Sequence, residues 1–146
     1  MINDTYDYVI TQGKTLFAFK SEGVKGSIIK LVLFEITDDG KWNLAFGDLK
    51  NGDIDDSVIT NNQDAIKVIR TVAKITIEFL EENPLATIKI EPVDEKRKKL
   101  YNFTFQRHFK EIEPIFKVIG LINGIKERYT PLKIYDSFEI SLKSEL

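Results

Sequence analysis

The sequence predicts an α+β domain with a mostly antiparallel, curved sheet and two helices. Turn-forming glycines separate alternating apolar and polar segments in the first third of the chain. A stretch with apolar residues at helical spacing follows these strands. Strands and helices do not alternate regularly, which argues against a parallel, doubly wound sheet. The predicted order is four or five strands, a helix, a strand, a helix and two strands, in a single domain over residues 1–146.

The first half of the chain reads as a series of strands. Residues 6–19 predict a hairpin that turns at Gly13, and the next turn lies between Gly23 and Gly26. Two further strands are expected at residues 27–36 and 41–46. We expect Gly47 to end the fourth strand, residues 48–57 to form a polar loop, and residues 58–59 to form a short strand or turn.

Two helices are predicted in the second half. The first begins near Asn61 or Asn62, which can cap it, and ends at Asn83-Pro84. A strand is expected at residues 86–90. Residues 94–112 fit a helix capped by Asp94, although the alternation over residues 101–105 also fits a strand; we favour the helix because of its length. Strands at residues 116–122 and 132–142, separated by Asn123-Gly124 and a loop near Thr130-Pro131, complete the order.

The charge is divided unevenly along the chain. The first 64 residues hold six Lys and eleven acidic residues, whereas residues 65–146 hold fifteen basic and twelve acidic residues. The basic excess is concentrated at residues 96–99 and is followed by aromatic residues. Lys and Arg bind phosphates, and aromatic rings stack on bases, so this segment predicts a single-stranded nucleic-acid site. Its predicted residues are Lys96, Arg97, Lys99, Tyr101 and Arg107.

The sequence contains no recognisable motif for a catalytic or a metal-binding site. The chain has no cysteine, so thiolate chemistry is unavailable, and we expect a reducing, cytoplasmic location. The lone His108 has no nucleophile motif to serve, and the acidic loop lacks the spacing of a calcium-binding loop. We therefore expect no catalytic residues, no metal and no cofactor. Residues 1–7 lack the basic-then-apolar order of a signal peptide and the apolar runs are short, so we expect neither export nor membrane association.

Several motifs resemble a family of small, functionally uncharacterised bacterial proteins of similar length. They are the turn at residues 22–26, the AFGD strand end at residues 45–48, the paired Asn61-Asn62, and RKKLY at residues 97–101, where the family has Arg-x-Arg-Leu-Tyr. Arg97 matches the motif, whereas Lys99 replaces an arginine and lacks its planar fork. The resemblance implies no known activity.

Residues 13–35 also resemble the first two strands of the PUR repeat, whose sheet binds single-stranded nucleic acid. This likeness implies a second candidate surface on the sheet, formed by Phe17, Phe19, Lys20 and Lys30. Phe17 and Phe19 would stack on bases if they face outward, and would pack the core if they face inward.

The leading hypothesis is a non-catalytic binding module for single-stranded DNA or RNA. The alternative is a protein-interaction module, either a homodimer in which acidic and basic halves meet or a partner of an acidic or operon-encoded protein. A hydrolase or transferase using Asp48, Arg97 and His108 is the least favoured class.

Overall fold

The computed structural model describes residues 3–55 and 62–143. Within them lie two helices and nine strands that form a mostly antiparallel sheet, so the predicted α+β class is confirmed. The chain divides into two compact units, one of residues 1–35 and 44–82 and the other of residues 36–43 and 83–146. That the chain forms a single domain stays a prediction. The strand or turn expected at residues 58–59 lies outside the described residues.

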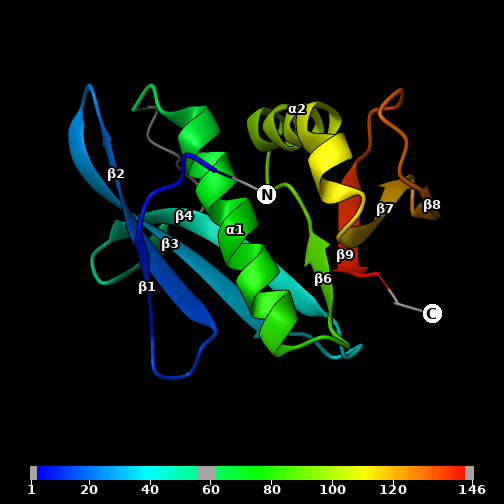
Figure 1. The fold of residues 1–146 in the computed structure, drawn as a ribbon, viewed down its shortest axis with the longest axis horizontal. Helices are drawn as coiled ribbons and strands as arrows, with labels where there is room; N and C mark the ends of the chain where they lie inside the picture. Colours follow the sequence, from blue (N-terminus) through cyan, green and yellow to red (C-terminus); the bar gives the residue numbers. More distant parts are fainter. Residues whose placement is uncertain (1–2, 56–61, 144–146) are drawn as a thin grey trace. The chain divides into compact units, whose positions relative to one another are not determined.

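The first unit is built from consecutive strands followed by a helix. The strands pair in chain order, and helix α1 lies across them (Figure 1). The first four strands begin near their expected positions, and α1 ends before Asn83-Pro84 as predicted. The fifth strand is a correction, because it lies within residues 48–57, which were expected to form a polar loop. The elements are β1 (Tyr8–Ile10), β2 (Leu16–Gly23), β3 (Gly26–Ile36), β4 (Trp42–Lys50), β5 (Asp53–Asp55) and α1 (Ala65–Glu82).

The sheet of the first unit buries one face beneath α1. Odd-numbered residues of β2 and even-numbered residues of β3 share this face because Phe17 pairs with Val32 and Phe19 with Lys30. The rings of Phe34 and Phe79 stack at 4.1 Å between centroids and so join β3 to α1. Aromatic packing of this kind adds to the hydrophobic stabilisation of the core.

The expectation that β4 ends at Gly47 is wrong. β4 continues to Lys50, turns at Asn51-Gly52 and pairs with β5. Both turn residues have positive φ, 51° and 80°, as a tight two-residue hairpin turn requires. Asp48 therefore lies inside a strand, where its carboxylate is 2.5 Å from the Lys30 ammonium, and both side chains are at most 2% exposed.

A polar cluster ties the β2–β3 turn to the start of α1. The Asn62 side chain accepts a hydrogen bond from the Lys25 backbone N–H at 2.6 Å and donates to the Gly26 carbonyl at 2.8 Å. Ser21 and Tyr6 both donate to the Asp64 carboxylate, at 2.5 and 2.6 Å. Asn62 thus holds the hairpin in place, and the expectation that it caps the helix is wrong, because its side-chain hydrogen bonds go to residues 21–26 and α1 begins only at Ala65. Asn61 lies outside the described residues.

The second unit also places one helix on one face of its strands. Its elements are β6 (Thr87–Ile90), α2 (Glu95–Ile112), β7 (Phe116–Ile122), β8 (Ile125–Arg128) and β9 (Ser137–Leu142), hydrogen-bonded in the order β6-β9-β7-β8. The first residues of β4 pair with β6 in parallel. Phe105 of α2 stacks on Phe138 of β9 at 4.3 Å, and Asn102 bonds both the N–H and the C=O of Tyr135.

The segment between residues 94 and 142 confirms the favoured helix and corrects one loop. α2 begins as predicted after Asp94, whose side chain accepts a hydrogen bond from the Arg97 N–H at 2.8 Å. Residues 125–128, expected to be loop, form β8, which pairs with β7 through the Asn123-Gly124 turn. The last strand is shorter than expected, because it begins at Ser137.

We predict that Gly23→Ala destabilises the protein. A Cβ at this position would lie 2.0 Å from the Asn62 carbonyl oxygen, so the hairpin and the start of α1 would have to separate. Overpacking of this kind costs about 1–3 kcal/mol. Urea denaturation measures the loss. The control is Gly13→Ala, where the nearest atom is 3.8 Å away, and equal effects of both changes would contradict the close approach.

The buried Lys30–Asp48 pair gives a second prediction. Asp48→Asn should cost about 3–5 kcal/mol, because it leaves a buried ammonium without its counter-charge. The double variant Lys30→Met/Asp48→Leu should be more stable than Asp48→Asn, because it removes both charges. Urea denaturation of the two variants tests the ordering, and the reverse ordering would show that the charges do not depend on each other.

Candidate functional site

Three of the four residues predicted on the sheet surface lie in the core. Phe17, Phe19 and Lys30 are 2%, 4% and 1% exposed. The Phe19 ring has Tyr6 at 6.0 Å and Phe46 at 6.5 Å, both nearly parallel to it. The inward alternative, core packing, is therefore the observed one for Phe17 and Phe19, and only Lys20 of this set is exposed.

Arg97 is buried at the start of α2, although its neighbours in the basic run are not. It is 4% exposed, and its Nη1 lies 2.6 Å from the Asp94 carboxylate. Its Nε and Nη2 are buried with no hydrogen-bond partner in residues 3–55 and 62–143. Arg97 therefore joins the helix cap to the interior, and a buried guanidinium in this position cannot meet an external phosphate.

The exposed side of α2 carries a basic and aromatic surface. We call the α2 stripe the set of residues that recur every three or four positions along this side, so that they share one helix face. All of them are exposed. The stripe consists of Lys96, Lys99, Phe103, Arg107 and Lys110.

Phe103 is the unusual member of the stripe. Among the ten phenylalanines of the chain, all within the described ranges, it is the only one classed as exposed, with half of its surface open to solvent. The Arg107 guanidinium lies 6.0 Å from the centre of its ring, at the outer limit of a cation–π contact. Lys99 precedes Phe103 by one helical turn. The ring is thus flanked by cations on its own helix face.

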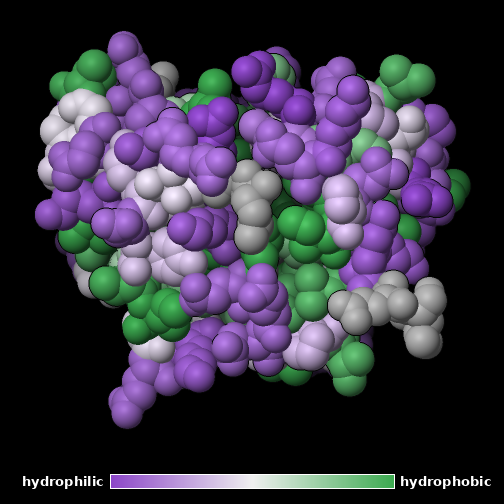
Figure 2. Space-filling view, viewed as in Figure 1, coloured by the Kyte–Doolittle hydropathy of each residue, from purple (hydrophilic) through white to green (hydrophobic). Residues whose placement is uncertain are grey.

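The four cations of the α2 stripe have no close ion-pair partner among the described residues. None of them forms an ion pair with any residue of the described part. In the view of Figure 2 the surface over α2 is mainly hydrophilic. Unpaired cations on one helix face raise the local potential, which attracts an anionic partner even though the chain as a whole carries a net charge of −2.

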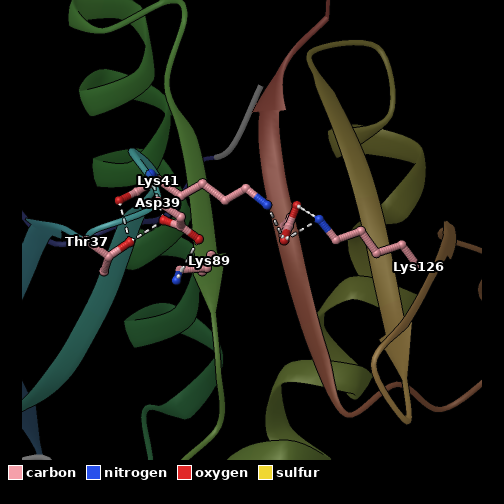
Figure 3. Close-up of polar contacts among 6 residues, drawn as sticks. Thr37, Asp39, Lys41, Lys89 and Lys126 are labelled. Carbon is pink, nitrogen blue, oxygen red and sulfur yellow. Dashed lines mark hydrogen bonds and ion pairs between the residues drawn. The ribbon is translucent and has the colours of Figure 1, made fainter.

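A second group of lysines, on the uncovered face of the second unit's strands, is paired instead. Lys41 and Lys126 reach the Glu139 carboxylate from two sides, at 3.0 and 3.2 Å (Figure 3). Lys89, on the same face as Glu139, lies 3.4 Å from Asp39. Because carboxylates hold these ammonium groups, this face is a weaker candidate for an anion than the α2 stripe.

The acids of this paired group have lowered pKa values. Hydrogen bonds from the Thr37 hydroxyl and the Lys41 backbone N–H, with a smaller effect of Lys89, lower the pKa of Asp39 to about 2. Partial burial by itself would raise the pKa of Glu139, but hydrogen bonds from Lys41 and Lys126 outweigh it and lower that pKa. Both carboxylates are therefore charged at neutral pH.

The structure places the other sequence candidates in separate surroundings. Tyr101 is half-buried, so Phe103, not Tyr101, is the open ring of α2. Helical periodicity from Lys96 could have identified Phe103, but the strand-like alternation over residues 101–105 obscured that signal. Asp48 belongs to the first unit, while Arg97 and His108 belong to the second, where the His108 ring lies 3.7 Å from Glu111.

The described residues contain neither a cluster of metal ligands nor a helix that could cross a membrane. Residues 3–55 and 62–143 contain no group of three or more His, Asp or Glu side chains placed to hold a metal ion. Neither α1 nor α2 combines the length and the apolar character that crossing a membrane would require. The absence of catalytic activity stays a prediction.

We predict that the β3–β4 turn loses stability in acid. The Asp39 pKa is about 2 in the folded protein against 3.8 without these contacts, so its stabilisation is complete above about pH 4 and is lost as the pH falls toward 2. Thermal unfolding followed by circular dichroism should give wild type a higher melting temperature than the Asp39→Asn variant at pH 6. The difference between the two melting temperatures should disappear between pH 4 and pH 2. A gap that does not change with pH would contradict this role.

Comparison with known proteins gives a family but no activity. No curated protein and no solved structure matches the chain, so the likeness to PUR repeats is not shown. One family matches residues 3–143, which is nearly the whole sequence and includes both units. The motifs of the hairpin turn, the AFGD strand and the α2 start all lie within this match. The chain belongs to the family described as a family of unknown function (DUF6934).

Proposed function

We propose that this protein is a binding module that takes single-stranded nucleic acid on the α2 stripe. The observation that carries the proposal is an exposed aromatic ring, Phe103, between cations that have no ion-pair partner in the described residues. The cations and the ring suit different parts of a single-stranded nucleic acid. The cations meet phosphates, and the ring offers a stacking platform to any base.

The dimensions of the stripe suit a short single strand. From Lys96 to Lys110 the helix rises about 21 Å, at about 1.5 Å per residue. Four cations along this length would neutralise up to four phosphates, which gives a slope of about −2.8 in a plot of log affinity against log salt for a single strand. A duplex hides the faces of its bases, so it would gain from the cations but not from Phe103.

The proposal keeps the basic segment predicted from sequence and abandons the second candidate surface, on the sheet. Stacking by Phe17 and Phe19 would require rings at the surface, and both rings lie in the core. Of the residues predicted in the basic segment, Lys96, Lys99 and Arg107 remain in the proposed site. Arg97 supports it indirectly, because its bond to Asp94 helps to hold the first turn of α2.

A specific observation also supports a protein-interaction module as second candidate. The face of the first unit's sheet opposite Phe17 and Phe19 exposes Val9, Ile29 and Leu49, which are 67%, 42% and 37% accessible. Exposed apolar side chains on a sheet face without a covering helix favour association with a protein surface. Self-association that survives high salt, without binding of nucleic acid, would favour this candidate over the first.

Fluorescence anisotropy tests the nucleic-acid proposal directly. Labelled single-stranded DNA, single-stranded RNA and duplex DNA are titrated with protein at about 50 and 200 mM salt. Single strands should bind more tightly than the duplex. Phe103→Ala should weaken single-strand binding about 5- to 100-fold, which corresponds to about 1–3 kcal/mol for one stacked base.

Charge variants separate the stripe from general electrostatics. Lys99→Gln/Arg107→Gln should lower affinity at least about tenfold and reduce the salt slope, because two phosphate contacts are lost. Lys14→Gln/Lys74→Gln, which removes two exposed cations from the first unit, is the matched control and should change affinity less than about twofold. Equal losses in both double variants, or no binding at about 10⁻⁴ M protein, would overturn the proposal.

A further inference from the structure

A pocket of about 310 Å³ lies wholly within the second unit, beside the C-terminal end of α2. Figure 1 shows this end of the helix, in yellow, leading directly into β7. The pocket is lined by the end of α2 and the residue after it, by the first half of β7, by the end of β8 and the residue after it, and by the residue after β9. Its size is at the lower end of the range for small-molecule sites.

The floor of the pocket is aromatic and largely buried. Phe109, Phe116 and Tyr129 line it, and Phe116 and Tyr129 are each 4% exposed. The rings of Phe109 and Tyr129 lie 5.0 Å apart. The Tyr129 backbone is held by a hydrogen bond from its N–H to the Val118 carbonyl at 3.0 Å. Such a floor would contact a flat or apolar molecule without rearranging.

Tyr129, which lines the pocket, also has a hydroxyl group that the rest of the fold does not use. Its side chain is nine-tenths buried or more, yet its hydroxyl forms no hydrogen bond with the described part of the chain. The hydroxyl is open to solvent, because the only fully enclosed polar side-chain atoms without a partner in the described residues are two nitrogens of Arg97. Burial and the neighbouring Tyr135 raise the pKa of Tyr129 to about 12, so the hydroxyl keeps its proton and can donate it.

The rim of the pocket is mainly cationic. Lys117, Arg128 and Lys143 line it, with Glu113 as the one acid. All three cations are exposed, and none forms an ion pair with a residue in the described ranges. The Lys143 backbone is anchored by a hydrogen bond from its N–H to the Ile115 carbonyl at 3.1 Å. Unpaired cations and aromatic rings that line one pocket complement a ligand with one anionic end and one flat end.

We propose that this pocket binds a small organic anion, with an aromatic or other flat body on Phe109, Phe116 and Tyr129 and a carboxylate or phosphate group held by Arg128 and its neighbouring lysines. The Tyr129 hydroxyl donates a hydrogen bond to the bound molecule. This site does not depend on the α2 stripe, because the two share no residue.

Calorimetric titration of the whole protein tests the site with three probes. Indole-3-acetate supplies a carboxylate and phenyl phosphate supplies a phosphate, so the stronger of the two identifies the anionic group. Indole-3-ethanol is the uncharged match for indole-3-acetate. We expect a dissociation constant of about 0.1–1 mM for the better anion, as is usual for so few atoms, and binding of the uncharged probe at least about tenfold weaker.

Variants locate the binding and exclude a folding defect. Tyr129→Phe keeps the ring, and it should leave the melting temperature of the free protein nearly unchanged because the hydroxyl is open to solvent and forms no hydrogen bond with the described residues. It should weaken anion binding about 3- to 10-fold, and Arg128→Gln should do the same. Lys14→Gln/Lys74→Gln, outside the pocket, should leave anion binding unchanged.

Three outcomes would overturn the inference. They are no saturable heat with either anionic probe up to about 10 mM, equal affinity for indole-3-acetate and indole-3-ethanol, and unchanged affinity in both pocket variants. If the protein binds the anionic probes but does not bind single-stranded nucleic acid, the pocket inference stands and only the nucleic-acid proposal is overturned.

Discussion

The packing of one helix on one sheet face in each unit is the constraint on which the other features depend. A helix that covers a sheet requires an apolar face beneath it, and here that face is largely aromatic. Phe17 and Phe19 are therefore buried on the face that α1 covers, and Phe138 is buried against Phe105 of α2. What remains for binding is the solvent side of each helix and the sheet face that no helix of that unit covers.

Burial separates charges that look alike in sequence. Lys30 and Arg97 each lie in the interior with a carboxylate partner, Asp48 or Asp94. Lys96 and Lys99, on either side of Arg97, are exposed and have no ion-pair partner in the described part. A buried charge needs a partner because its desolvation is costly, whereas a solvated one does not. The basic run therefore consists of one buried arginine, one lysine paired with Asp136 and two exposed lysines that are available to anions.

Much of the fold could be predicted from sequence because its signals are local. Helical spacing and the Asp94 cap placed α2 correctly, and apolar spacing before Asn83-Pro84 placed α1. The predicted end of the fourth strand at Gly47 was wrong because glycine is common in turns, whereas here it lies inside β4. The continued strand brings Asp48 next to Lys30. β8 was missed because four mostly polar residues carry no apolar alternation.

The candidate site was predictable only in part. Alternation shows that Phe17 and Phe19 share a face, but not which face α1 covers, since that depends on contacts between distant residues such as Phe34 and Phe79. The α2 cations were visible as a run, whereas the exposure of Phe103 follows from the helical phase set by Phe105 and Asn102, which face inward. The pocket beside Tyr129 depends on loops that meet only in the folded chain.

The central claim is that single strands bind to the outer side of α2. The most direct measurement is a map of backbone ¹H–¹⁵N chemical shifts during titration with an oligothymidine. Binding at the α2 stripe predicts shifts concentrated between residues 96 and 110, together with an upfield shift of the Phe103 ring protons as a base stacks. Shifts confined to the strands of the first unit, or no shifts at all, would contradict it.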